Sequence, residues 1–435
     1  MLCVERRNRG NFTNRTRLRM LVGDFDSPER VSMQKMGREW INTPEFKAIN
    51  LQSAHEAIVL LRNSRGLLPL RGDYKRIAVI GANANSTVVF TGDYEGLADH
   101  IYTLLEGVSL RAPRAEVVFA PGCRDIFCNS TELFDDALSL AKTADLVILG
   151  FGTDKNAACE RDDLMETTCE GVSIGATQLP GCQGRLFDAI LSVNPNVVLV
   201  GMSGQQLNNP KNAETVLFAP FLGNFGGLAI ADVLFGRFNV GGRLPFTLYK
   251  ETEKLPAIGS YDMTSYPGRT YRYHRLEPEF PFGFGLSYSK FEYSDLRVST
   301  NQMKACESVK VEVEVKNLGP YDGNEVVQLY VSFLNVGAEL PIALTPIRTL
   351  QGVERVEIRN GETKTVRFEL EPINFSLIDE NGARRIFEGA YEIQVGGGQK
   401  GYAEVLTQKV EIRGPSVDME KCSKITYYCP DFSKY

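Results

Sequence analysis

Four short, almost wholly apolar runs separated by longer segments constrain the fold of this chain more than any other feature. They read IAVIG at 77–81, LVILGFG at 146–152, VVLVGMSG at 197–204 and VLFAPF at 216–221. Between them, residues 133–143 and 183–192 place apolar side chains at helical spacing. Strands that are apolar on both faces belong to a sheet covered on both sides, as in parallel strands joined by helices. The sequence therefore predicts an α/β sandwich with a mainly parallel sheet over residues 51–250.

Residues 291–415 predict a second domain that is built from strands alone. Val309, Val311, Val313 and Val315 alternate with lysine and glutamate, which is the period of a strand with one solvated face. Turn signals follow as Asp-Gly or Asn-Gly pairs at 322–323, 360–361 and 381–382. We expect an all-β sandwich that resembles the fibronectin type III fold. A connecting arm, 251–290, precedes it and a tail, 416–435, follows it.

Two further segments predict local structure at the edges of the α/β domain. Residues 44–70 read as a helix with one buried face, with Thr43 as its cap; the apolar positions are Ala48, Leu51, Ala54, Ile58 and Leu61. Residues 229–249 read as a helix that Gly236 ends, followed by a turn and an extended run over 244–248.

Composition excludes several classes of function. The 435 residues carry 54 acidic and 48 basic side chains without a basic stripe, so nucleic acid is not an expected partner. No apolar run approaches the roughly 18 residues that span a bilayer, so no membrane span is expected. Three histidines are too few for a histidine-based metal cage, and no metal or cofactor is predicted.

Nine cysteines suggest disulfides and an extracellular parent protein. We predict bridges between Cys123 and Cys128 and between Cys422 and Cys429, with unrelated thiols as the alternative. Five Asn-x-Ser/Thr sequons agree with secretion: Asn11, Asn14, Asn85, Asn129 and Asn374. The N-terminus, MLCVERRNRG, lacks the apolar centre of a secretory signal, which implies an N-terminus that has been lost.

Several ordered motifs together resemble the second half of a glycoside hydrolase family 3 enzyme, the family of β-glucosidases and β-xylosidases. They lie at 15–26, 44–70, 229–249, 268–273, 281–288 and 317–331. The resemblance implies that residues 1–50 are the end of a catalytic barrel and a linker. It also implies retaining hydrolysis of terminal β-linked xylose or glucose from oligosaccharides such as xylan fragments, with no cofactor.

The resemblance also indicates where the catalytic carboxylates belong. In the family the nucleophilic aspartate lies in the barrel, in an SDW-like motif that this sequence lacks, so the nucleophile is expected to be absent and the chain inactive alone. The acid/base glutamate follows the strand at 146–152. Counting forward from Gly152 selects Glu160, and counting back from Leu179 selects Glu170. We favour Glu160 and keep Glu170 as the alternative; both could instead be ordinary solvated loop carboxylates.

A non-catalytic protein that binds a glycan or a barrel-bearing partner chain is the competing interpretation. The surface of the segments that pack on the barrel in the family distinguishes the enzyme from this non-catalytic binder. An apolar surface there favours a partner polypeptide, whereas a polar surface favours an independent binder. Large apolar or aromatic side chains are kept at Ile41, Phe46, Tyr271 and Tyr273, which favours a truncated or two-chain enzyme over an independent binder.

Overall fold

The computed structural model describes residues 15–92, 95–96, 98–155, 179–205, 207–250, 260–336 and 345–422. The chain divides into two compact units, Met1–Gln52 and Ser53–Tyr435. In the described part of the first unit, residues 15–21 are helical and three short turns of 3-10 helix follow: η1 (Pro28–Arg30), η2 (Ser32–Lys35) and η3 (Arg38–Trp40). Helix α2 (Pro44–Ala57) crosses the division between the units.

The segment 44–70 is a helix followed by a strand, which corrects the prediction of a single helix. Thr43 caps α2 as expected, since its Oγ1 accepts the N–H of Phe46 at 3.3 Å. The helix ends at Ala57, and Ile58 and Leu61 lie in or beside strand β1 (Val59–Asn63), which pairs antiparallel with β6 (Thr215–Ala219). Four consecutive apolar residues, 58–61, are buried in β1 and directly before it, whereas a helix would place some of them on its exposed side.

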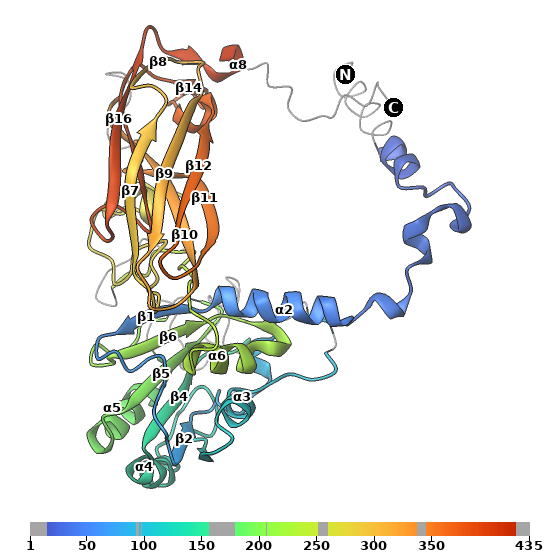
Figure 1. The fold of residues 1–435 in the computed structure, drawn as a ribbon, viewed down its shortest axis with the longest axis vertical. Coiled ribbons are helices and arrows are strands. Elements are labelled where there is room, and N and C mark those ends of the chain that lie inside the picture. Colours follow the sequence, from blue (N-terminus) through green and yellow to red (C-terminus); the bar gives the residue numbers. More distant parts are fainter. Residues whose placement is uncertain are drawn as a thin grey trace. The chain divides into compact units, whose positions relative to one another are not determined.

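The α/β part holds one six-stranded sheet with the order β1-β6-β5-β4-β2-β3 (Figure 1). The inner strands are β2 (Arg76–Ile80), β4 (Leu146–Gly152) and β5 (Val197–Met202), and β3 (Glu116–Ala120) forms an edge. All neighbouring pairs are parallel except β1 with β6. The mainly parallel sheet that the sequence predicts is therefore confirmed.

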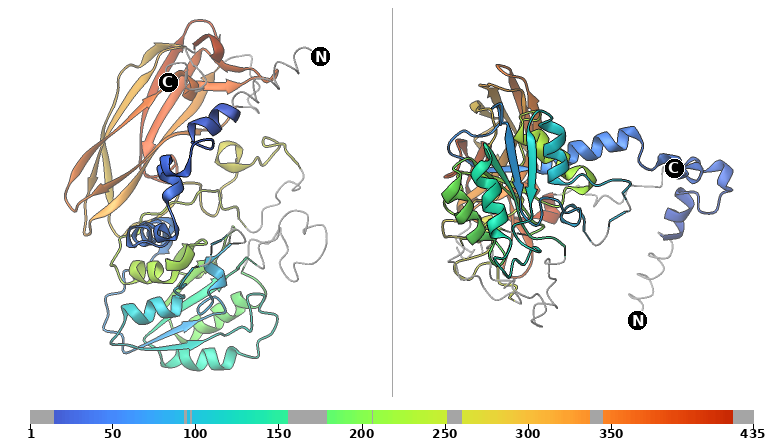
Figure 2. Two further views of the ribbon diagram at one scale, coloured as in Figure 1. Left: turned by 90° about the vertical axis from the view of Figure 1, so that its right-hand side faces the viewer. Right: turned by 90° about the horizontal axis from the view of Figure 1, so that it is seen from below.

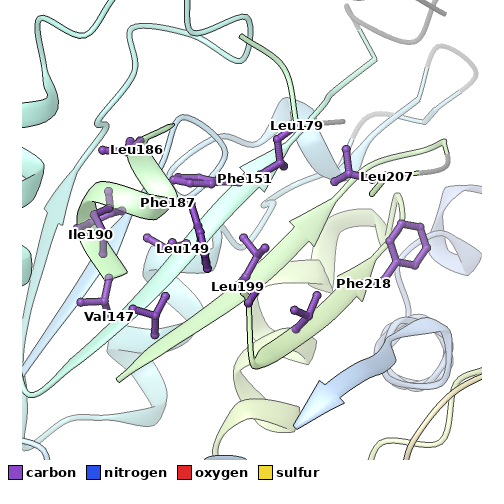
Figure 3. Packing of buried hydrophobic residues seen from close by; sticks show 14 of the residues in the cluster. Val147, Leu149, Phe151, Leu179, Leu186, Phe187, Ile190, Leu199, Leu207 and Phe218 are labelled. Atoms are coloured by element: carbon purple, nitrogen blue, oxygen red, sulfur yellow. The ribbon is translucent and has the colours of Figure 1, made fainter. Parts of the chain in front are cut away.

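Helices cover both faces of this sheet (Figures 1 and 2). On one side lie α4 (Phe134–Thr143) and α5 (Gln183–Val193); on the other, α3 (Leu104–Arg111) packs on α6 (Gly226–Leu234). The α5 side holds a continuous apolar core, in which Leu179 lies with Phe151, Leu186 and Leu207 (Figure 3). This packing fixes β4 and the start of α5, which flank the predicted acid/base segment.

Gly236 (φ +68°) follows the end of α6, as expected, but residues 244–248 do not form the predicted strand. They make one isolated bridge, between Leu248 and Phe280. The Leu244 N–H donates to Phe284 O at 2.8 Å and the Gly283 N–H to Leu244 O at 2.7 Å, yet Pro245 has no N–H with which to continue a ladder.

The C-terminal part is an all-β sandwich, as predicted. A five-stranded sheet has the order β11-β10-β15-β16-β8 and faces a three-stranded sheet, β12-β9-β7 (Figure 1). Their bounds are β7 (Phe291–Val298), β8 (Gln302–Lys304), β9 (Val309–Asn317), β10 (Gly323–Val336), β11 (Thr349–Ile358), β12 (Thr363–Leu370), β15 (Gly389–Gly396) and β16 (Val405–Arg413). The alternating valines of β9 are buried in the core between the sheets.

Smaller elements close one end of the sandwich. A third sheet is formed by β13 (Ser376–Ile378), β14 (Arg384–Ile386) and β17 (Val417–Asp418), and helix α8 (Met419–Cys422) follows it. Gly361 and Gly382 adopt positive φ in turns, as expected. Gly323 instead begins β10, and the tight turn before it falls at Gly319 (φ +85°).

The α/β part and the sandwich are joined through buried polar contacts. Arg243 forms an ion pair with Glu325 at 2.8 Å, and the Tyr293 hydroxyl donates to the other Glu325 oxygen at 2.7 Å. Tyr271, expected on a barrel-facing surface, instead stacks on Phe282 with centroids 4.4 Å apart. That aromatic residue of the arm is thus already used within this unit.

Two disulfides are formed by described cysteines. The bridge between Cys123 and Cys128 is confirmed. Cys422 bonds to Cys306 rather than to Cys429, which corrects the second prediction. Helix α8 packs its Met419 into the sandwich core, and this brings Cys422 beside Cys306, 116 residues away in sequence. Proximity along the chain therefore did not decide the pairing.

Candidate functional site

Both candidate acid/base residues, Glu160 and Glu170, lie outside the described residues, which stop at Lys155 and resume at Leu179. The structure nevertheless shows where this segment leaves and rejoins the fold. It leaves three residues after β4 ends at Gly152 and rejoins just before α5 begins at Gln183. In parallel sheets, loops at the carboxyl ends of the strands are the usual place for ligand sites.

Buried polar side chains hold the exit of β4. Thr153 donates its backbone N–H to Met202 O at 2.9 Å, and its hydroxyl lies 2.7 Å from the Ser203 hydroxyl. The Asn83 amide donates to Thr153 O at 3.2 Å. These groups come from the carboxyl ends of three adjacent strands, β2, β4 and β5, so the first residues after β4 have a fixed path.

The start of α5 is held as firmly on the other side. The Cys182 N–H donates to Cys128 O at 3.0 Å, which joins α5 to the Cys123–Cys128 disulfide loop. Gln183 is buried and makes three hydrogen bonds with its side chain amide. Sequence reasoning did not single out Gln183, although it lies four residues after Leu179, from which Glu170 was counted back.

One ion pair lies near the exit of β4. Lys155 Nζ lies 3.0 Å from Glu95 Oε1. Hydrogen bonds from Thr91 and then from Lys155 lower the pKa of Glu95. A general acid needs a raised pKa, so Glu95 is unsuited to that role.

A hollow of about 790 Å³ lies beside the start of α5, within the size range of small-molecule sites. Three cations and two carboxylates line it: Arg185, Lys211, Lys250, Asp188 and Glu279. Arg62 pairs with Glu279 at 2.5 Å, so the charge of the lining is positive on balance.

Within the described ranges, no group of three or more His, Cys, Asp or Glu side chains is placed to hold a metal ion. The same part of the chain contains no helix long and apolar enough to cross a membrane.

Comparison with known proteins agrees with this architecture. Residues 58–288 match the glycosyl hydrolase family 3 C-terminal domain, and residues 325–399 match the fibronectin type III-like domain. The class of protein that the fold defines is therefore a family 3 C-terminal domain followed by a fibronectin type III-like domain. The chain belongs to glycosyl hydrolase family 3.

Curated relatives and solved structures show the same resemblance. The chain is 32% identical to β-xylosidase/α-L-arabinofuranosidase 1 of Medicago sativa subsp. varia, over 89% of this chain and 52% of the relative. It is 33% identical to β-glucosidase BoGH3A of Bacteroides ovatus, over 75% and 46% respectively. The family 3 exo-β-xylosidase XlnD, solved with a xylobiose aziridine probe, superposes with a TM-score of 0.76 at 26% identity, covering 90% of this chain and 51% of XlnD. The chain thus spans about half the length of the relatives it matches.

Proposed function

We propose that this chain supplies the acid/base half of a retaining β-glycosidase that removes terminal β-linked xylose or glucose from oligosaccharides. The observation that carries the proposal is the match of residues 58–288 to the C-terminal domain of the family. Retaining hydrolysis uses two carboxylates roughly 5–5.5 Å apart, one as nucleophile and one as proton shuttle. Glu160 is proposed as the shuttle, with Glu170 as the alternative.

Xylose is the first sugar to test. The Medicago relative is named a β-xylosidase, and the structural relative XlnD is an exo-β-xylosidase, whereas the Bacteroides relative is named a β-glucosidase. Terminal β-linked glucose is therefore the second candidate.

A barrel that carries the nucleophile is proposed to complete the site. The first unit exposes many large apolar side chains, as expected of a surface that packs against another polypeptide. They are Leu18, Met20, Leu21, Val22, Phe25, Met33, Met36, Trp40, Ile41, Phe46 and Ile49. The same observation favours the second candidate function, a non-catalytic protein that binds a barrel-bearing partner. The two disulfides support an extracellular parent protein.

Hydrolysis of nitrophenyl β-xyloside and β-glucoside tests the proposal. Purified residues 1–435 should match an empty-vector control, and addition of a family 3 barrel, fused or in trans, should produce activity. Turnover by residues 1–435 alone would contradict the two-part site. Binding of a barrel without any turnover would favour the non-catalytic partner protein.

Substitution of each glutamate separates the two acid/base candidates in the completed enzyme. A nitrophenolate leaves without a proton, whereas the sugar leaving group of xylobiose needs one. The true acid/base variant should therefore lose kcat/KM on xylobiose by roughly 10²–10⁴-fold and retain much more of its kcat/KM on nitrophenyl xyloside. The comparison uses kcat/KM because the same residue is also the base that takes a proton from water when the glycosyl-enzyme is hydrolysed, a step that both substrates share. We expect this pattern for Glu160→Gln and not for Glu170→Gln.

A further inference from the structure

The side chain of Gln183 completes the end of β4 in place of a missing strand. Strand β2 ends at Ile80, which pairs with Leu149 of β4. Gly152 lies three residues further along β4 and therefore has no strand partner on that side. The Gly152 N–H donates to Gln183 Oε1 at 2.8 Å, and Gln183 Nε2 donates back to Gly152 O at 3.0 Å. One amide thus satisfies both backbone groups of Gly152, as a neighbouring strand would.

The same amide reaches a third part of the chain. Gln183 Nε2 also donates to Ile126 O, at 2.6 Å, inside the loop closed by the Cys123–Cys128 disulfide. Gln183 is only 2% exposed, and each of its three hydrogen bonds is therefore shielded from water. Its side chain links the end of β4, the start of α5 and the disulfide loop.

Gly152 has little conformational freedom at the joint between the end of β4 and the Gln183 amide. It adopts φ +130°, and a Cβ there would lie 2.0 Å from Met202 O of β5. Gly152 is therefore wedged between β5 and the Gln183 amide. Gly152 lies three residues before Lys155 and Gln183 lies four residues after Leu179, so this joint ties together the two stretches of chain that flank the intervening segment.

We propose that Gln183 is a positioning residue for glycoside hydrolysis: its amide clamps both ends of the segment that carries the acid/base glutamate. This inference rests on the proposed function. Gln183 does not itself transfer a proton, since it holds backbone groups of Gly152 and Ile126. Gln183 instead helps to set the distance between the proton donor and the glycosidic oxygen, and the rate of hydrolysis depends steeply on that distance.

Gln328 provides a matched control. It is also 2% exposed, its Nε2 also donates to two backbone carbonyls, Gly283 O at 2.9 Å and Gly397 O at 3.1 Å, and its Oε1 also accepts one hydrogen bond, from Tyr330. It lies in β10 of the sandwich. If the loss of any buried glutamine amide were the cause, Gln183→Leu and Gln328→Leu should have the same effect on Gly152 and on hydrolysis. If the clamp is the cause, only Gln183→Leu should affect them.

Hydrogen exchange on residues 1–435 tests the clamp without reference to activity. In Gln183→Leu, exchange of the Gly152 N–H should rise by roughly tenfold or more, as expected from the loss of one buried hydrogen bond. Exchange at Val147 and Leu149 in the middle of β4 should be unchanged, and Gln328→Leu should leave Gly152 unchanged. Equal protection of Gly152 in Gln183→Leu and the unsubstituted chain would overturn the proposal. Gln183→Asn, which keeps an amide that is too short, replaces Gln183→Leu if that variant does not fold.

The barrel-completed enzyme tests the catalytic consequence. Gln183→Leu should lower kcat/KM on xylobiose by roughly 10²-fold, with much less change in kcat/KM on nitrophenyl xyloside, because only xylobiose needs a positioned acid to form the glycosyl-enzyme. Gln328→Leu should leave kcat/KM on both substrates unchanged. An equal loss of kcat/KM on both substrates in Gln183→Leu would refute positioning and leave a structural role. If the completed enzyme hydrolyses neither substrate before substitution, the proposed function fails, and the hydrogen-exchange result still decides the clamp.

Discussion

Replacing Glu325 by alanine should strongly destabilise the contact between the α/β part and the sandwich. The Glu325 side chain is 3% exposed and its partner Arg243 is 10% exposed. Removing one partner of a buried pair leaves the other charge without compensation, which costs about 3–5 kcal/mol. Burial, and then the Glu325 carboxylate, raise the pKa of Tyr293 well above its ordinary value, so its hydroxyl is a donor that also loses its acceptor.

A cycle of variants separates the contribution of the two charges to the free energy of unfolding from that of the Tyr293 hydroxyl. Arg243→Met combined with Glu325→Leu should recover most of the loss, because it removes both charges together. A residual deficit of about 1–3 kcal/mol is expected from the unpaired Tyr293 hydroxyl, and adding Tyr293→Phe should reduce it. Glu411 is the control: it pairs with Arg413 at 2.7 Å on the surface, and Glu411→Ala should cost no more than about 1 kcal/mol.

Urea unfolding followed by circular dichroism measures these differences. Glu325→Ala should either shift the midpoint or split one transition into two, as the α/β part and the sandwich begin to unfold separately. The reasoning is refuted if Glu325→Ala costs less than about 1 kcal/mol, or if the charge-free double variant loses the sum of its two single variants.

Three further predictions follow from other contacts. Burial alone would raise the pKa of Asp232, but hydrogen bonds from His55 and Arg111 outweigh it and lower that pKa below 3.8. The stability that this group contributes should be present above about pH 4 and decline below it. An Asp232→Asn variant whose acid unfolding parallels that of the unsubstituted chain would contradict this. A Cβ on Gly227 would lie 2.0 Å from Thr103 O, whereas one on Gly184 would meet nothing; thermal unfolding should show a loss of roughly 2–3 kcal/mol for Gly227→Ala and a change within about 1 kcal/mol for Gly184→Ala. Peptide mapping without reduction should recover Cys306 joined to Cys422, and replacing both by serine should cost about 2–5 kcal/mol; recovery of a bridge from Cys422 to the tail instead would contradict this connectivity.

Part of the candidate site could be predicted from sequence patterns, and the rest depends on tertiary packing. The segment between Gly152 and Leu179 was identifiable because an apolar strand precedes it and because the resemblance to family 3 places the acid/base glutamate between these two residues. Gln183 was not, because a glutamine in a helix is as easily a solvated residue as a buried one. Its role depends on β2 ending three residues earlier than β4, which is a property of the sheet and not of either segment.

The sequence by itself determined the two fold classes, since apolar strands with intervening helices and alternating valines express the burial of each face directly. It also determined the Thr43 cap and the Cys123–Cys128 bridge, which are local. Only the tertiary structure decided that residues 59–63 pair with β6, that Cys422 meets Cys306 and that Gln183 replaces a strand beside Gly152. Each of these depends on groups far apart in the chain, and their pairing free energy arises only after the surrounding core has excluded water.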